Sequence, residues 1–491
     1  MSIFVEDSLS GEMVEVGDRG LLGLYVCGPT VYDHIHIGNA RAPLFWDVVV
    51  RYLRSRGYDV TFVQNITDIE DKIINKANEE DVPWQEIVSR YTDSFHERLD
   101  MLGIGMPDVE PRATEHIPEM ISLIEDLIEK GHAYAPEEAN GDVYYAVSSF
   151  PRYGALSHQR PDEMRETERV QTGFKRSPLD FALWKASKPG EPSWDSPWGA
   201  GRPGWHIECS AMVGKHLPDG ADIHGGGTDI RFPHHENELA QSAAAHPDRP
   251  FVRAWAHHGM VTLGGTDKMA KSVGNVLDVE RAVDRHGRNA IRMWLLQSHY
   301  SQPIEYSREI VEEKGRAWER LMRLYRQISC SQTSSEHSDA LAVELRDSFD
   351  AAMSDDLNTP EALAAVFDVA GRAGQEVSTR SEAAGEFGSL AEAIEEVITI
   401  FGFDLPEERV EEVDGIGIGL GSLVPSTTAS EKSGRWIRAS MPNIEILKKV
   451  AKREKARRDK DWATADRLRD ELHADGWAVE DTAERPILSR R

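Results

Sequence analysis

The sequence predicts an α/β protein in which a Rossmann-like domain with an insertion is followed by a helical-bundle domain and a small C-terminal domain. Three observations support this prediction. Strand and helix patterns alternate up to about residue 305, long helical patterns follow residue 306, and the last 51 residues carry 13 Lys and Arg against 11 Asp and Glu. A chain of 491 residues is expected to divide, because single cores stop growing at about 250 to 300 residues.

The alternating pattern begins with the apolar run GLYVC at residues 23–27, which predicts a strand. Apolar residues at helical spacing between Gly38 and Gly57 predict a helix, and residues 59–65 predict a second strand. The pattern resumes as a strand, a helix and a strand in ADIHG, HHENELAQSAAA and FVRAWAHHG. This order favours a mostly parallel sheet that binds a nucleotide at its strand ends.

Residues 115–200 interrupt that pattern and are predicted to form an insertion. Thr114 and Gly131 bracket an amphipathic helix, Asn140 and Gly141 suggest a hairpin tip, and a segment rich in Pro, Gly and Trp follows. The expected domains are a catalytic domain with its insertion, a helical domain, a flexible linker and a C-terminal domain, at 1–305, 306–410, 411–434 and 435–491.

The chain is acidic, with 56 Lys and Arg against 84 Asp and Glu and a net charge of −28. It contains three cysteines, too few for a disulfide framework, and no apolar run of the roughly 18 residues that a membrane span needs. We therefore expect a cytoplasmic protein without a membrane partner. The acidic excess fits a salt-rich cytosol, where charge repulsion is screened, or an ordinary protein kept soluble by its net charge.

Two short motifs point to nucleotide chemistry. His36, Gly38 and Asn39 follow the first strand and open the first helix, where backbone N–H groups and the helix dipole suit a phosphate. Lys268 and Lys271 lie in a glycine-flanked loop, KMAKS, that can neutralise charge on a pyrophosphate leaving group. Either motif alone is commonly a turn, but the pair in this order indicates a triphosphate site.

A possible metal site comprises Cys27, Cys209, His234 and Glu238. His234 and Glu238 are four residues apart on one predicted helix face, and two thiolates, an imidazole and a carboxylate suit Zn²⁺. Their spacing matches no compact zinc motif, and scattered cysteines are often buried as small apolar residues. From the residues alone, both interpretations stay open.

Several longer motifs resemble those of the cysteinyl-tRNA synthetases, which are class I aminoacyl-tRNA synthetases: YVCGPTVYDHIHIGNAR, NITDIEDKI, RPGWHIECSAM, DIHGGGTDIRFPHHENELAQS and HHGMVTLGGTDKMAKSVGNV. The resemblance covers roughly residues 20–310 and continues in KDWATADRLRDEL. It implies ATP-dependent ligation of L-cysteine to tRNA(Cys) through a cysteinyl-adenylate, with release of AMP and diphosphate. One position departs from the family's HIGH motif, which ends in Asn39 here.

The resemblance also implies roles for individual residues. His36, Asn39, Lys268 and Lys271 would be catalytic, and the four possible metal ligands would hold one Zn²⁺ that binds the substrate. Mg²⁺ would accompany ATP. The implied ATP-binding residues are His36, Gly38, Asn39, Gly226, Asp229 and Lys271, and the implied substrate-binding residues are Thr67, Trp205 and His224. For Trp205 and His224, ordinary packing is an equally good interpretation. The three adjacent glycines that include Gly226 could likewise form an ordinary turn.

The C-terminal domain is expected to bind tRNA and its anticodon, in a chain that is expected to be a monomer. Residues 448–460 hold eight basic side chains in thirteen, and Trp462 follows. Such a helix can grip phosphates and stack a base, or it can be a solvated face with its Trp packed inward. Two rival functions remain: a cysteine ligase for a small amino-sugar acceptor, and a non-catalytic paralogue.

Overall fold

The computed structural model forms two compact units. One comprises Met1–Val279, Leu295–Ser307 and Ala351–Pro360, and the other comprises Glu280–Trp294, Arg308–Asp350 and Glu361–Arg491. The structure describes residues 2–17, 20–137, 141–160, 174–264, 267–268, 277–329, 333–380, 385–405, 409–413, 416–420, 444–475, 477–481 and 486–490.

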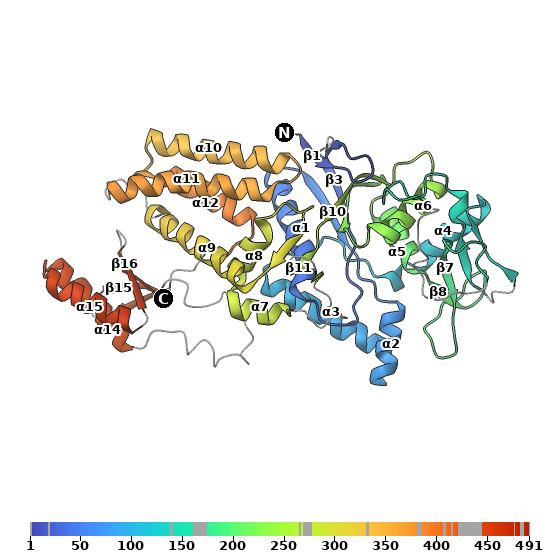
Figure 1. Cartoon of the computed structure of the whole chain (residues 1–491), viewed down its shortest axis with the longest axis horizontal. Coiled ribbons are helices and arrows are strands. Elements are labelled where there is room, and N and C mark those ends of the chain that lie inside the picture. The colour runs from blue at the N-terminus through green and yellow to red at the C-terminus, as the bar shows by residue number, and fades with distance from the viewer. Residues whose placement is uncertain are drawn as a thin grey trace. The chain divides into compact units, whose positions relative to one another are not determined.

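The centre of the first unit is a four-stranded sheet in the order β10-β9-β3-β4. Its strands are Val252–His258, Ala221–Gly227, Leu21–Val26 and Asp59–Gln64, and every neighbouring pair is parallel. The expected parallel sheet is therefore confirmed. Because parallel strands end at one edge, the residues that follow β3 and β9 meet there. Figure 1 shows this sheet beside α1 (Ile37–Ser55).

Helix α1 packs closely on the sheet because its inner face is apolar and the strand beneath it is glycine-rich. Leu44, Val48 and Tyr52 are fully buried, and Trp46 lies against Gly225 of β9. A Cβ atom on Gly225 would lie 2.4 Å from the Trp46 ring. Only glycine therefore permits this contact between helix and strand.

The predicted insertion forms helix α4 (Ile117–Glu129) and an antiparallel sheet in the order β5-β6-β7-β8. The four strands are Ala133–Tyr134, Val143–Tyr145, Phe181–Ala186 and Gly201–Pro203. Val143 and Tyr145 pair with β7, but Asn140 of the expected hairpin tip lies outside the described residues. The insertion leads into α5 (Trp205–His216), which packs with α6 (Glu236–Ala245) in Figure 1.

The other elements of the first unit are β1 Ile3–Glu6, β2 Met13–Val16, α2 Asp71–Glu80, α3 Trp84–Met101, β11 Val261–Leu263, β12 Asp267–Lys268 and β13 Ile304–Tyr306. Helices α7 (Val279–His286) and α8 (Arg288–Leu296) belong almost entirely to the second unit. Short one-turn helices lie at Ala113–Glu115, Val147–Ser149 and Arg231–His235. No helix among the described residues is long and apolar enough to cross a membrane.

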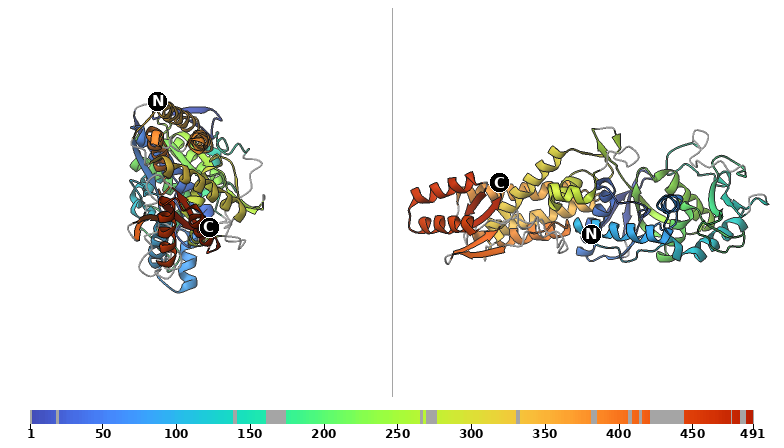
Figure 2. Two further views of the ribbon diagram at one scale, coloured as in Figure 1. Left: turned by 90° about the vertical axis from the view of Figure 1, so that its left-hand side faces the viewer. Right: turned by 90° about the horizontal axis from the view of Figure 1, so that it is seen from below.

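The second unit contains four long helices, α9 Arg308–Ser329, α10 Glu336–Ser354, α11 Thr359–Thr379 and α12 Gly388–Ile400, of which α10 and α11 extend into the first unit at the turn between them. It also contains a sheet in the order β14-β15-β17-β16, formed by Arg409–Val413, Ile416–Leu420, Pro486–Arg490 and Trp477–Asp481. Helices α14 (Ile444–Arg458) and α15 (Trp462–Ala474) lie side by side in Figure 2.

This sheet corrects the predicted linker at 411–434. Strands β14 and β15 pair across Val413 and Ile416, and Ile418 is fully buried in the core that α14 covers. The hairpin was not apparent from the sequence because IGIGL is rich in glycine and RVEEV contains two adjacent glutamates, and these residue types are uncommon in strands. Residues 421–434 lie outside the described residues.

Candidate functional site

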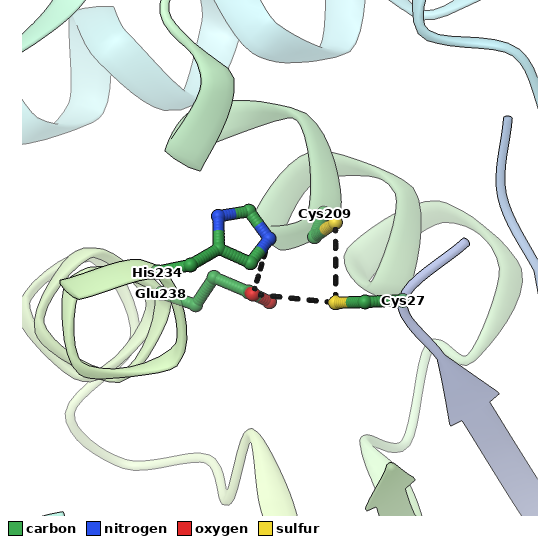
Figure 3. A group of neighbouring side chains, drawn as sticks. All are labelled: Cys27, Cys209, His234 and Glu238. Carbon is green, nitrogen blue, oxygen red and sulfur yellow. Dashed lines mark hydrogen bonds and ion pairs between the residues drawn. The ribbon is translucent and has the colours of Figure 1, made fainter. Parts of the chain in front are cut away.

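Four side chains from three separate segments of the sequence converge at the carboxyl edge of the central sheet (Figure 3). Cys27 follows β3, Cys209 lies in α5, His234 lies in the turn before α6, and Glu238 lies in the first turn of α6. Their ligand atoms all lie within 4.8 Å of one another. The structure thus brings together the four residues that the sequence suggested as metal ligands.

The distances suit a common centre rather than direct bonding. Cys27 Sγ lies 3.6 Å from Cys209 Sγ, well beyond the S–S bond length of about 2.05 Å. Cys27 Sγ is also 3.6 Å from Glu238 Oε1, and His234 Nε2 is 3.1 Å from the same oxygen. Both cysteines are free thiols.

The electrostatics of the cluster favour a bound cation. Burial raises the pKa of the Cys27 thiol and of the Glu238 carboxyl well above their ordinary values, and burial lowers the pKa of His234 well below its own. Glu238 Oε2 is buried and accepts no hydrogen bond from a described residue. A divalent cation offsets the desolvation of thiolates and a carboxylate, and neutral imidazole is the form that binds metals. The donor set fits Zn²⁺.

Two further histidines enclose the same centre. His224 Nε2 and His235 Nε2 lie 3.5 and 3.3 Å from Cys27 Sγ, and together with Cys27 and Glu238 they form a second possible set of metal ligands. His235 Nδ1 contacts His257 Nε2 at 2.9 Å, which orients its other nitrogen toward the thiol. The sequence interpretation missed His235, although its position three residues before Glu238 is a usable signal.

The predicted substrate residues surround this cluster. Trp205 stacks on the His234 ring, with ring centroids 4.2 Å apart and an angle of 15° between the planes. Thr67 is buried, accepts a hydrogen bond from Asn65 Nδ2 and donates one to Glu208 Oε2. Thr67 is thereby linked to α5, the helix that carries Cys209.

The start of α1 shows why His36 and Asn39 have this spacing. The Gly38 N–H donates to His36 Nδ1 at 3.1 Å, and the His36 N–H donates to Asn39 Oδ1 at 3.1 Å, which forms a capping box. His36 Nε2 must then carry the ring proton and is the nitrogen that can donate to a phosphate. The Gly38 N–H donates within this cap, and the place of Gly38 in ATP binding stays a prediction.

The residues that follow the lysine-bearing loop are held beside the N-terminus of α1. Ile37 N donates to Leu277 O at 2.9 Å, His36 pairs with Asp278 in a β-bridge, and Arg98 Nη2 lies 3.3 Å from Asp278 Oδ2. Lys268 lies in β12, where its backbone pairs with Thr262. Lys271 lies outside the described residues.

Gly226 and Asp229 lie at the end of β9. A Cβ on Gly226 would lie 2.4 Å from the His235 ring, so glycine is needed there for close packing. Asp229 lies close enough to His258 to oppose the burial that lowers the pKa of that imidazole to about 4. The structure thus gives Gly226 a packing role, in addition to its predicted place near adenosine.

Comparison with known proteins defines the class. Residues 13–316 match the family described as tRNA synthetases class I (C) catalytic domain, and residues 348–405 match the DALR domain. The fold is also that of a Mycobacterium tuberculosis methionyl-tRNA synthetase in complex with methionyl-adenylate, at a TM-score of 0.58 and 19% identity over 78% of this chain and 90% of that one. The protein is a class I aminoacyl-tRNA synthetase.

Curated relatives narrow the class further. A cysteine–tRNA ligase of Rubrobacter xylanophilus is 69% identical, with 100% of both chains covered. A cysteine–tRNA ligase of Thermodesulfovibrio yellowstonii is 43% identical over 97% of this chain and 96% of its own length. This chain belongs to the cysteine–tRNA ligase family.

Proposed function

We propose that this chain attaches L-cysteine to tRNA(Cys) with ATP, and that it selects cysteine through a Zn²⁺ ion held by Cys27, Cys209, His234 and Glu238. Family membership supplies the reaction. The observation that supports the ion is the convergence of four donor atoms, three of them on buried side chains, within 4.8 Å of one another.

The proposed ion answers a problem of selectivity. Cysteine and serine differ by one atom, and packing around so small a difference yields only about 1–3 kcal/mol. When bound, Zn²⁺ prefers a thiolate to a hydroxyl and so distinguishes the two amino acids at binding. Trp205 covers His234 and His224 contacts Cys27, so both would exclude water and orient the substrate beside the ion.

The residues at the start of α1 would position ATP for attack by the cysteine carboxylate. His36 Nε2–H donates to a phosphate oxygen, while Asn39 fixes the backbone of His36 and therefore the direction of its ring. Lys268 and Lys271 would neutralise the pyrophosphate that leaves, with Mg²⁺ bound to the nucleotide. Positioning and charge stabilisation account for this chemistry, so no protein nucleophile is needed.

The C-terminal part of the second unit would contact tRNA. Lys452, Lys455 and Arg458 are exposed on α14 at three-residue intervals and make no ion pair with a described residue, whereas Lys449 pairs with Asp475 at 2.6 Å. Trp462 is 59% exposed at the start of α15, so it is not packed inward. A row of unpaired cations beside an exposed indole suits phosphates and a base. We place the chain in the cytoplasm, where its substrates meet, and expect a monomer.

X-ray absorption at the zinc edge of the purified protein tests the proposal. We expect two sulfur neighbours without cysteine and three when cysteine is added, with no change when serine is added. A zinc-free protein that still exchanges pyrophosphate into ATP in the presence of cysteine would overturn the role of the ion. Charging assays with tRNA test the acceptor separately.

A further inference from the structure

A cavity lies between α4 and α5, and none of the four candidate metal ligands lines it. It has a volume of about 310 Å³, near the lower end of the range for small-molecule sites. Ser210 lines it, whereas the neighbouring Cys209 is directed to Cys27. The cavity is therefore separate from the candidate metal centre, although both share one helix.

Helix α4 of the insertion forms one wall and is tied down at both ends. Near its start Glu119 pairs with Lys215 of α5 at 3.0 Å, and just beyond its end Lys130 Nζ donates to Ala245 O of α6. Between these two contacts the helices leave an open space. An added Cβ on Gly214 of α5 would find no atom within 4 Å.

The cavity presents two opposite charges that no protein group neutralises. Neither Arg249 nor Asp126 makes an ion pair or side-chain hydrogen bond with any residue that the structure describes. Both act on His246, which also lines the cavity: burial, Lys130 and Arg249 lower the pKa of His246, and Asp126 opposes that shift. One cationic and one anionic side chain, neither of them paired with a described residue, therefore line the same cavity.

The rest of the lining is apolar with a few hydroxyl groups. Leu123, Leu217 and Phe251 provide apolar surface, and the buried Ser242 makes no side-chain hydrogen bond to a described residue. A ligand that carries a carboxylate, an ammonium group and a short apolar side chain would satisfy every part of this lining. Such a ligand is a free α-amino acid.

We propose that this cavity is an accessory binding site for a free α-amino acid with an apolar side chain. The ligand carboxylate faces Arg249 and His246, its ammonium group faces Asp126, and its side chain packs on Leu123 and Phe251. Neither the reaction nor the metal centre requires such a site, so the proposal stands apart from the proposed function.

Calorimetric titration of the full chain with L-leucine tests the proposal. We expect saturable binding with a dissociation constant in the millimolar range, and binding weaker by about tenfold or more for leucinol and for N-acetyl-leucine, which each lack one charge. Gly214→Leu fills the cavity and should abolish binding. Gly371→Leu, at another helical glycine with open space around it, should leave binding unchanged.

Arg249→Met provides a second variant. Because Arg249 is exposed, we expect this replacement to leave the stability of the fold unchanged. It should weaken leucine binding by about tenfold and leave leucinol binding unchanged. Two results would overturn the proposal: no saturable binding of leucine to the unmodified chain, or leucine binding that persists unchanged in Gly214→Leu. The second result would place leucine elsewhere, including the site for the substrate amino acid.

Discussion

At the scale of single residues, Cys209 separates metal binding from nucleotide binding. Its side chain is 1% exposed, and its Sγ lies 3.6 Å from Cys27 Sγ. It belongs to α5 and not to the N-terminal cap of α1. Cys209→Ser replaces a soft ligand by a hard one, so we expect the protein to lose zinc. Its affinity for cysteine should fall by at least about 100-fold, whereas its affinity for ATP should stay within about threefold of the unmodified value. Metal analysis and equilibrium binding measure this. Cys330→Ser, outside every motif, is the control; equal losses for both ligands would contradict the assigned role.

Asn39 is the residue at which this chain departs from its family's motif, and the capping box gives it a structural function. Asn39→Ala removes the acceptor for the His36 N–H and should lower the free energy of unfolding by about 1 kcal/mol. Asn39→Asp keeps the acceptor but adds a negative charge beside the phosphates, so it should retain stability and slow pyrophosphate exchange by about tenfold. Denaturant unfolding and exchange assays measure the two effects. Equal stability of all three proteins would exclude the capping role.

The protonation of the metal ligands predicts how zinc binding depends on pH. Because burial raises the pKa of Cys27 and Glu238 in the metal-free fold, both hold protons that zinc must displace. Zinc affinity should therefore rise with pH, and binding should release one proton from each of the two groups. Calorimetry in buffers of different ionisation enthalpy counts these protons. A zinc affinity that does not change between about pH 6 and about pH 8 would refute the prediction.

At the scale of elements, α14 predicts the salt dependence of tRNA binding. Lys452, Lys455 and Arg458 are exposed and unpaired with described residues, so each can release a counterion when it contacts a phosphate. Replacing all three by Ala should weaken binding and reduce the slope of log affinity against log salt by about two units. Lys448→Ala is the control, because Lys448 already pairs with Glu445 at 3.4 Å. A slope unchanged by the triple replacement would remove α14 from the interface.

The elements also show where sequence interpretation succeeds. β3, β4 and α1 were predictable because the two strands contain apolar runs and α1 has a clear helical period. The glycine-rich β9, ADIHGGG, was predictable only from its place in the alternation of strands and helices. The hairpin of β14 and β15 was not predictable, because β14 contains two adjacent glutamates and β15 contains two glycines, and these residue types are uncommon in strands. Cys27 and Cys209 were predictable from their residue types as possible metal ligands, and the family motifs supported their pairing, since 182 residues separate them in the sequence. His235 was missed because its neighbour His234 already formed an i, i+4 pair with Glu238, although both imidazoles are buried beside the cluster.

At the scale of the whole molecule, the two units predict separate responses to metal removal. All four candidate ligands lie in the first unit, and none lies in the second. Calorimetry should therefore show two unfolding transitions, and a chelator should lower the midpoint of only one of them. Bound zinc stabilises the folded first unit by about 2.7 kcal/mol when free zinc is at 100 times its dissociation constant, and the chelator removes this stabilisation. Cys209→Ser should reproduce the chelator effect and should show no further change with chelator. A single transition, or an equal shift of both transitions, would show that the units unfold together and would refute the prediction.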